Sequence, residues 1–160
     1  MGTGHVTTLI NLIIKMNGFK GPDWYQAGDS SMKPGYIAME DDLDEIKICT
    51  ANGFPIGIVG CPSYHDLNTV FTAGEKIPLF PRGCGVVMYV AFDDDTGATT
   101  YTRNSILTID DANAGCAMAW SYTDQDSALT NTLAYTIGYL TQEVTTTADA
   151  LVYVPCRLSI

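Results

Sequence analysis

The chain has 160 residues, of which 46% are hydrophobic and only 16% are charged, so it is too apolar for a disordered protein and long enough for one packed domain. Eighteen Asp and Glu against eight Lys and Arg give a formal net charge of -10, which argues against nucleic acid and anionic membrane surfaces as partners. The apolar run at residues 9–14 is much shorter than the ~20 residues of a membrane-spanning helix, and the first basic residue follows it. We therefore expect no membrane span, no secretory signal and synthesis in the cytoplasm.

The chain begins with a strand-prone segment and an irregular loop. Residues 6–14 predict a strand, and residues 18–34 combine Gly, Pro and polar residues with the aromatic pair Trp24 and Tyr25. Such a pair either closes one end of the core or packs on a partner. We expect residues 1–33 to form an N-terminal arm and loop, and residues 34–160 to form a single β domain.

A strand-prone terminus can add a strand to the sheet of a neighbouring molecule, and exposed aromatic side chains are favoured at interfaces. We therefore expect partner contacts in the first 33 residues. The six candidates are His5, Val6, Leu9, Ile10, Trp24 and Tyr25.

The rest of the chain alternates short β-prone runs with turn signals about every ten residues. The remaining predicted strands cover residues 35–39, 45–50, 55–60, 76–80, 85–92, 99–102, 105–109, 117–122, 135–140 and 150–158. Short helical turns are predicted at 63–70 and 109–114. The pattern is typical of a mainly β protein, a small curved β-barrel or β-sandwich with one or two short helices and an extended N-terminal arm.

Glycines interrupt several of these runs, as Gly57 does in FPIGIVG and Gly138 does in AYTIGYL. A glycine inside a strand often marks a bulge, a sharp bend or a close approach of two backbones. These positions predict strong curvature.

Two acidic segments are candidates for surface loops. Residues 40–45 are predicted to be a solvated loop that shields a strand edge. Asp93 and Asp95 begin a stretch like a calcium loop, but its twelfth position is Asn104 where an EF-hand has Glu. A hairpin turn between residues 86–92 and 98–102 explains the same residues, with Ca²⁺ at Asp93 and Asp95 as the open alternative.

The sequence holds no convincing catalytic motif. The five cysteines are odd in number and form no CxxC pair, which favours free, buried thiols. Cys61 and His65 make half of a nucleophile–base pair or half of a zinc site, but the other ligands or the orienting group are missing. We expect no enzymatic activity, no cofactor and no other metal site.

The order of segments resembles the capsid decoration, or cement, proteins of tailed viruses. The resemblance covers residues 34–158 and is carried by five segments: a strand with an acidic hairpin, IGIVG, TAGEKIPLFPRGCGVVM, SILTID, and TIGYLTQEV followed by the terminal LVYVPCRL. It implies a homotrimer on the exterior of an icosahedral head, bound to the major capsid protein and stabilising the shell.

Two alternatives to this function remain open from the residues alone. Tyr and Trp on a sheet face can stack on sugars, which describes a β-sandwich binding module for carbohydrate or a host surface. A β-rich chain can also be a self-assembling shell or fibre subunit. A decoration protein differs from that subunit because it stays a discrete oligomer until it meets the capsid.

Overall fold

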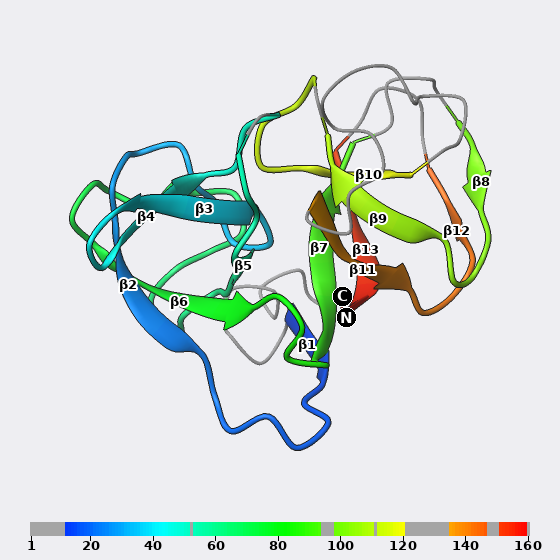
Figure 1. Cartoon of the computed structure of the whole chain (residues 1–160), viewed down its shortest axis with the longest axis horizontal. Helices are drawn as coiled ribbons and strands as arrows, with labels where there is room; N and C mark the ends of the chain where they lie inside the picture. Colours follow the sequence, from blue (N-terminus) through cyan, green and yellow to red (C-terminus); the bar gives the residue numbers. More distant parts are fainter. Residues whose placement is uncertain are drawn as a thin grey trace.

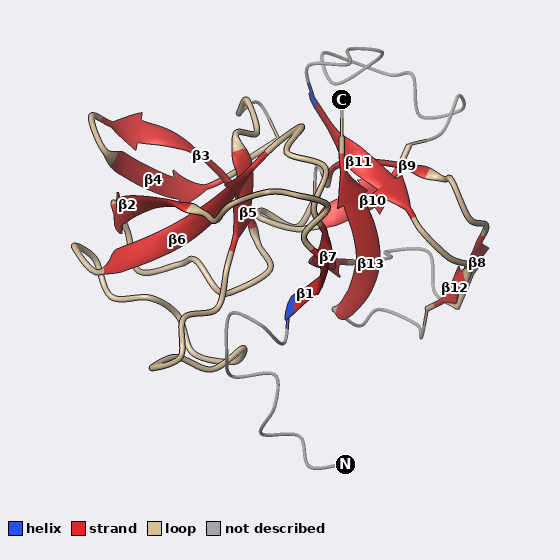
Figure 2. Ribbon diagram, turned by 90° about the horizontal axis from the view of Figure 1, so that it is seen from below, coloured by secondary structure: helices blue, strands red, loops and turns tan. Residues whose placement is uncertain are grey.

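The computed structural model describes residues 12–51, 53–93, 98–110, 112–120, 135–146 and 151–159. In these ranges the chain is mainly β, as predicted, and its strands close into barrels instead of stacking as a sandwich. Figures 1 and 2 show two groups of strands side by side, which we call the first and the second barrel.

The first barrel is a closed ring of five strands in the order β2-β4-β3-β5-β6. Its strands are β2 (Asp23–Ala27), β3 (Ile37–Asp42), β4 (Glu45–Ile48), β5 (Gly57–Val59) and β6 (Lys76–Pro81). The β2–β4 pair is parallel, and the other pairs are antiparallel. Closure leaves this sheet without a free edge.

The second barrel is built on a six-stranded sheet in the order β1-β7-β10-β9-β11-β13. Its strands are β1 (Ile13–Lys15), β7 (Val87–Phe92), β9 (Ile106–Ile109), β10 (Ala117–Ala119), β11 (Thr136–Leu140) and β13 (Val152–Leu158). A further pairing of β13 with β7 closes the last five strands into a ring. On the other edge of β7, β10 pairs with Phe92 and β1 pairs with Val87 and Met88. A small separate ribbon joins β8 (Thr100–Tyr101) to β12 (Val144–Thr145).

Three strands of the first barrel, β3, β5 and β6, each contribute side chains to two hydrophobic cores. Consecutive side chains of a strand point to opposite faces, so neighbours in sequence enter different cores. On β6, Ile77 and Leu79 fill the first barrel, whereas Phe80 joins a larger cluster that continues through the second barrel. On β5, Ile58 belongs to the larger cluster and Val59 to the first barrel. The uninterrupted apolar runs of these strands follow from burial on both faces.

Hydrogen bonds also join the two barrels. Gly115, which follows β9, accepts the N–H of Ile37 and donates to the carbonyl of Cys49, both at 2.8 Å. Gly115 has φ +80, and a Cβ there would meet Tyr36 and Ile48, so only glycine fits this contact. The Tyr153 hydroxyl donates to the carbonyl of Pro34 over 3.1 Å. The barrels therefore form one packed unit.

The structure corrects the predicted loop at residues 18–34. Residues 23–27 form β2, which pairs with β4 and β6 inside the first barrel. The division proposed at residue 33/34 therefore falls within that barrel. Of the strand predicted at 6–14, residues 6–11 lie outside the described residues, and Ile13 pairs with Met88 of the same chain.

Three further local predictions were wrong. Residues 63–70 form turns in place of a helix, because the Asp66 carboxylate accepts the backbone N–H groups of Asn68 and Thr69, both at 2.8 Å. In the helical turn predicted at residues 109–114, the Asp110 carboxylate accepts the N–H of Ala112 in the same way. Residue 111 is outside the described residues. The strand at 99–102 also does not return against β7, because β8 pairs with β12.

The prediction for the strand glycines is confirmed. A Cβ at Gly57 would collide with the backbone carbonyl of Phe80, and one at Gly138 would collide with that of Arg157. The β11–β9 register shifts between Thr136 and Gly138, which marks a bulge. Both glycines allow two strands to approach closely.

Candidate functional site

Trp24 is the most prominent of the predicted contact residues. It lies on β2, its ring points away from the barrel core, and 50% of it is exposed. The next residue, Tyr25, points the other way and packs against the core of the first barrel. Burial, followed by the charges of Asp23, Glu40 and Asp44, raises the pKa of Tyr25. Only Trp24 of the predicted pair presents a large apolar surface to solvent.

A second exposed aromatic residue meets the same region of the barrel. Tyr64 is 62% exposed, and its hydroxyl donates to the carbonyl of Lys76 over 2.6 Å. Trp24 is paired across the strands with Pro78, two residues further along β6. Two residues of a strand span about 6.6 Å, so the carbonyl that holds the Tyr64 hydroxyl and the cross-strand partner of Trp24 lie close together on β6. We call Trp24 and Tyr64 the aromatic pair of the first barrel.

The other four predicted contact residues, His5, Val6, Leu9 and Ile10, lie outside the described residues. The structure therefore places only the end of the predicted arm, at β1.

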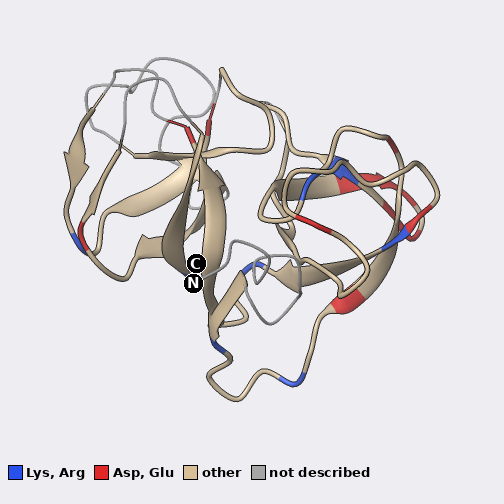
Figure 3. Ribbon diagram, turned by 180° about the vertical axis from the view of Figure 1, so that it is seen from behind, with Lys and Arg blue, Asp and Glu red and all other residues tan. Residues whose placement is uncertain are grey.

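The acidic segment forms a tight hairpin between β3 and β4, where a loop was predicted. Asp42 pairs with Glu45, and Asp44 takes φ +60 at the turn. Leu43, at the tip, is 86% exposed, and Asp41 forms an ion pair of 2.7 Å with Lys47. Figure 3 shows most of the described acidic segments on the first barrel. The aromatic pair thus belongs to the more acidic of the two barrels.

Cys61 and His65 lie close together but are not arranged as a nucleophile and its base. The Cys61 Sγ donates to the backbone carbonyl of His65 over 3.4 Å, while the imidazole stacks on Phe71 at 4.0 Å between ring centroids. The ring Nδ1 donates to the carbonyl of Asp66 over 2.8 Å. Burial, and secondarily the Asp66 charge, raises the pKa of Cys61 to about 11, so the sulfur is a thiol at neutral pH.

Of the two residues predicted to bind Ca²⁺, the structure describes only Asp93. Asp93 follows β7, and its N–H donates to the carbonyl of Ala117 over 3.2 Å, whereas Asp95 lies outside the described residues. Among the residues that the structure describes, no group of three His, Cys, Asp or Glu side chains is placed to hold a metal ion. Ca²⁺ at Asp93 and Asp95 stays a prediction.

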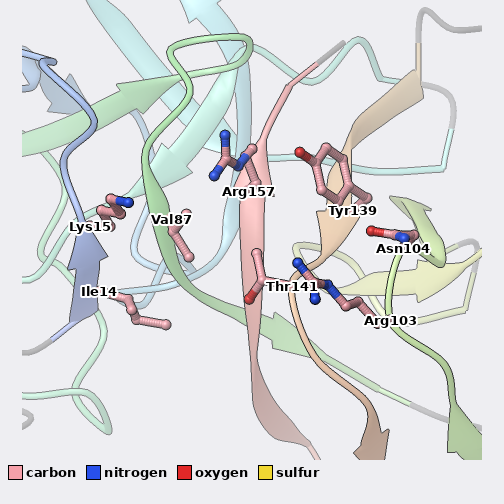
Figure 4. Close-up of a pocket in the computed structure, with 8 residues that line it drawn as sticks. All are labelled: Ile14, Lys15, Val87, Arg103, Asn104, Tyr139, Thr141 and Arg157. Carbon is pink, nitrogen blue, oxygen red and sulfur yellow. The ribbon is translucent and has the colours of Figure 1, made fainter.

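Sequence reasoning missed a cavity of about 300 Å³ on the outside of the second barrel. Three cations line it, Lys15, Arg103 and Arg157, and no acidic side chain of the described residues does (Figure 4). They are three of only eight Lys and Arg in the chain. They lie far apart in sequence and share no motif, so only the strand pairing brings them together.

Comparisons with known proteins leave the geometry as the main guide to function, because no family model matches the chain and no curated protein matches it. Within the described ranges, no helix has the length and apolar character needed to cross a membrane.

Proposed function

We propose that the chain is a non-enzymatic decoration protein that binds the outside of an icosahedral viral head and stabilises its shell. The observation that carries the proposal is the aromatic pair of the first barrel: Trp24 on the closed ring of strands and Tyr64 hydrogen-bonded to that ring, both exposed. Trp and Tyr are the residue types enriched at the energetic centres of protein interfaces.

The setting of these rings supports an interface function. Trp24 belongs to a strand bonded on both sides, to β4 and β6, so its backbone loses little entropy on binding. The Tyr64 ring is fixed by its hydrogen bond to β6. Two preorganised rings provide a small anchor that suits a weak contact repeated many times.

We also propose that the working form is a homotrimer whose partner is the major capsid protein. Three weak contacts held in one rigid oligomer bind with a high effective concentration, so a small anchor per subunit gives firm attachment. The -10 charge of each chain keeps crowded copies soluble and mutually repelling. Location on the virion surface, after synthesis in the host cytoplasm, is part of the same proposal.

Co-sedimentation tests this proposal. The purified chain is mixed with heads of the virus that encodes it, stripped of their surface proteins, and the heads are pelleted. We expect the chain to pellet with them to a saturable level and to raise the temperature at which they break. A chain that remains in the supernatant at all concentrations contradicts the proposal, and its retention on immobilised polysaccharide would then favour the carbohydrate-binding alternative.

A further inference from the structure

The cation-lined cavity of the second barrel is built on one row of outward-facing residues across four strands. Lys15 pairs with Val87, Val87 pairs with Arg157, and Arg157 pairs with Tyr139. Residues that pair directly across strands share a face of the sheet. Lys15 and Arg157 are therefore about 10 Å apart at their backbones, a distance at which two long side chains reach one small ligand.

A turn beside this row brings in the third cation. The backbone N–H of Ser105 donates to the carbonyl of Thr102 over 3.2 Å. This bond closes a turn with Arg103 and Asn104 at its centre. Asn104 takes φ +72 and donates its N–H to the carbonyl of Leu140, so the turn is fixed against β11. Arg103 and Asn104 both line the cavity.

These cations have no partner of opposite charge among the described residues. The ion pair that the described residues form joins Lys47 to Asp41, in the first barrel. The Nε of Arg157 is buried and has no hydrogen-bond partner. A partly buried guanidinium that no carboxylate neutralises is costly, and a bound anion offsets that cost.

The other polar groups of the cavity also suit an anion. Arg103 and Arg157 offer forked donors, Lys15 a point charge, and Asn104 and Tyr139 add an amide and a hydroxyl group. The cavity of about 300 Å³ has room for one small group and its nearest atoms. Figure 4 shows these side chains arriving from separate segments of the second barrel.

We propose that this cavity is a binding site for a single oxyanion, a phosphate or sulfate group or a carboxylate, contacted by Lys15, Arg103 and Arg157. Three unpaired cations around one cavity stand out in a chain of net charge -10. The surrounding negative potential weakens general attraction of anions, so only convergent donors hold one there. This site is independent of the proposed decoration function.

Isothermal titration calorimetry at pH 7.5 and constant ionic strength tests the site, with inorganic phosphate, sulfate and acetate as separate titrants. We expect saturable binding at one site per chain. Arg103→Gln removes an exposed turn side chain, so it leaves the fold intact and weakens binding about tenfold or more. Lys15→Gln, at a second exposed position, weakens it in the same direction.

Lys76→Gln is the matched control, because it removes one exposed positive charge from the first barrel, outside the cavity. The affinity of Lys76→Gln for each anion stays at the wild-type value if the site is as proposed. Absence of saturable binding for all three anions overturns the proposal, and so does an equal loss in Lys76→Gln and Arg103→Gln. The ranking of the titrants distinguishes a tetrahedral oxyanion from a carboxylate as the bound group.

Discussion

Gly138 shows how a single residue fixes the second barrel. A Cβ there would meet the backbone of Arg157 on the neighbouring strand, and backbone cannot move aside as a flexible side chain can. We predict that Gly138→Ala lowers the free energy of unfolding by about 2 to 3 kcal/mol through overpacking. Urea unfolding followed by circular dichroism measures this loss.

Gly74→Ala serves as the comparison for that variant. Gly74 has φ +83 but open space around its Cα, so an added methyl costs only the backbone strain, about 1 kcal/mol. An equal loss for the two variants would show that the close contact at Gly138 contributes nothing.

The buried thiols predict a dependence of stability on alkaline pH. Burial raises the pKa of Cys49 to about 12, and that of Cys61 is about 11, whereas a thiol in the unfolded chain ionises near pH 8.5. Above about pH 8.5 the unfolded chain therefore releases protons that the folded chain keeps, so the free energy of unfolding falls as pH rises. Below that pH these two groups have no effect.

Urea midpoints at pH 7.5 and pH 10 check this prediction, and we expect the lower midpoint at pH 10. Cys61→Ala removes one of the two thiols, so the difference between its two midpoints should be smaller than in the wild-type chain. A difference of the same size in this variant would assign the alkaline loss to other groups.

Trp24 is the residue on which the proposed function depends most. We predict that Trp24→Ala weakens co-sedimentation with stripped heads by tenfold or more, since central aromatic anchors contribute about 2 kcal/mol or more to interfaces. Its urea midpoint changes little, because half of the side chain is already exposed. Leu151→Ala is the control. Leu151 is 39% exposed and directly precedes β13 of the second barrel, so this variant should bind as the wild type does. Full binding by Trp24→Ala would remove the aromatic pair from the interface.

At the scale of elements, the sequence predicts most strands but not how they are grouped. Each long apolar run, such as that of β6 or β13, is a strand because turn residues bound it on both sides. β2 escapes prediction because its five residues lie among Gly, Pro and Asp, and only pairing with β4 and β6 holds them extended. The division of the strands into two barrels follows from contacts far apart in the chain, which local patterns do not encode.

Truncation tests the placement of β2. A chain of residues 34–160 lacks a strand of the first barrel, so we predict that it loses cooperative unfolding and exposes Ile77 and Leu79. A chain that begins at residue 12 keeps every described strand and should unfold cooperatively. Thermal unfolding followed by circular dichroism compares the two. Cooperative unfolding of residues 34–160 at the wild-type temperature would mean that β2 is dispensable.

The two candidate surfaces differ in how far the sequence reveals them. Trp24 is found from sequence because an aromatic residue in a Gly- and Pro-rich segment has few apolar neighbours to bury it. Lys15, Arg103 and Arg157 are not found, because their proximity depends on strand register and on one turn. The Tyr64 contact with β6 is missed for the same reason.

At the scale of the whole molecule, two closed barrels joined through one core make a block in which most of the described strands are paired on both sides. Such a block suits an oligomer that forms through side-chain contacts and then stops growing. The proposed function requires this behaviour, since a decoration protein must stay discrete until it meets a head.

Light scattering at moderate and high salt gives the mass of the purified chain in solution, and this mass shows whether the chain forms a discrete trimer. We expect one discrete species at about three times the 17.3 kDa chain mass, unchanged by dilution across the micromolar range. Particles of megadalton size would contradict it and favour a self-assembling shell. A monomer at every concentration would contradict the trimer and leave the aromatic pair as an anchor without avidity.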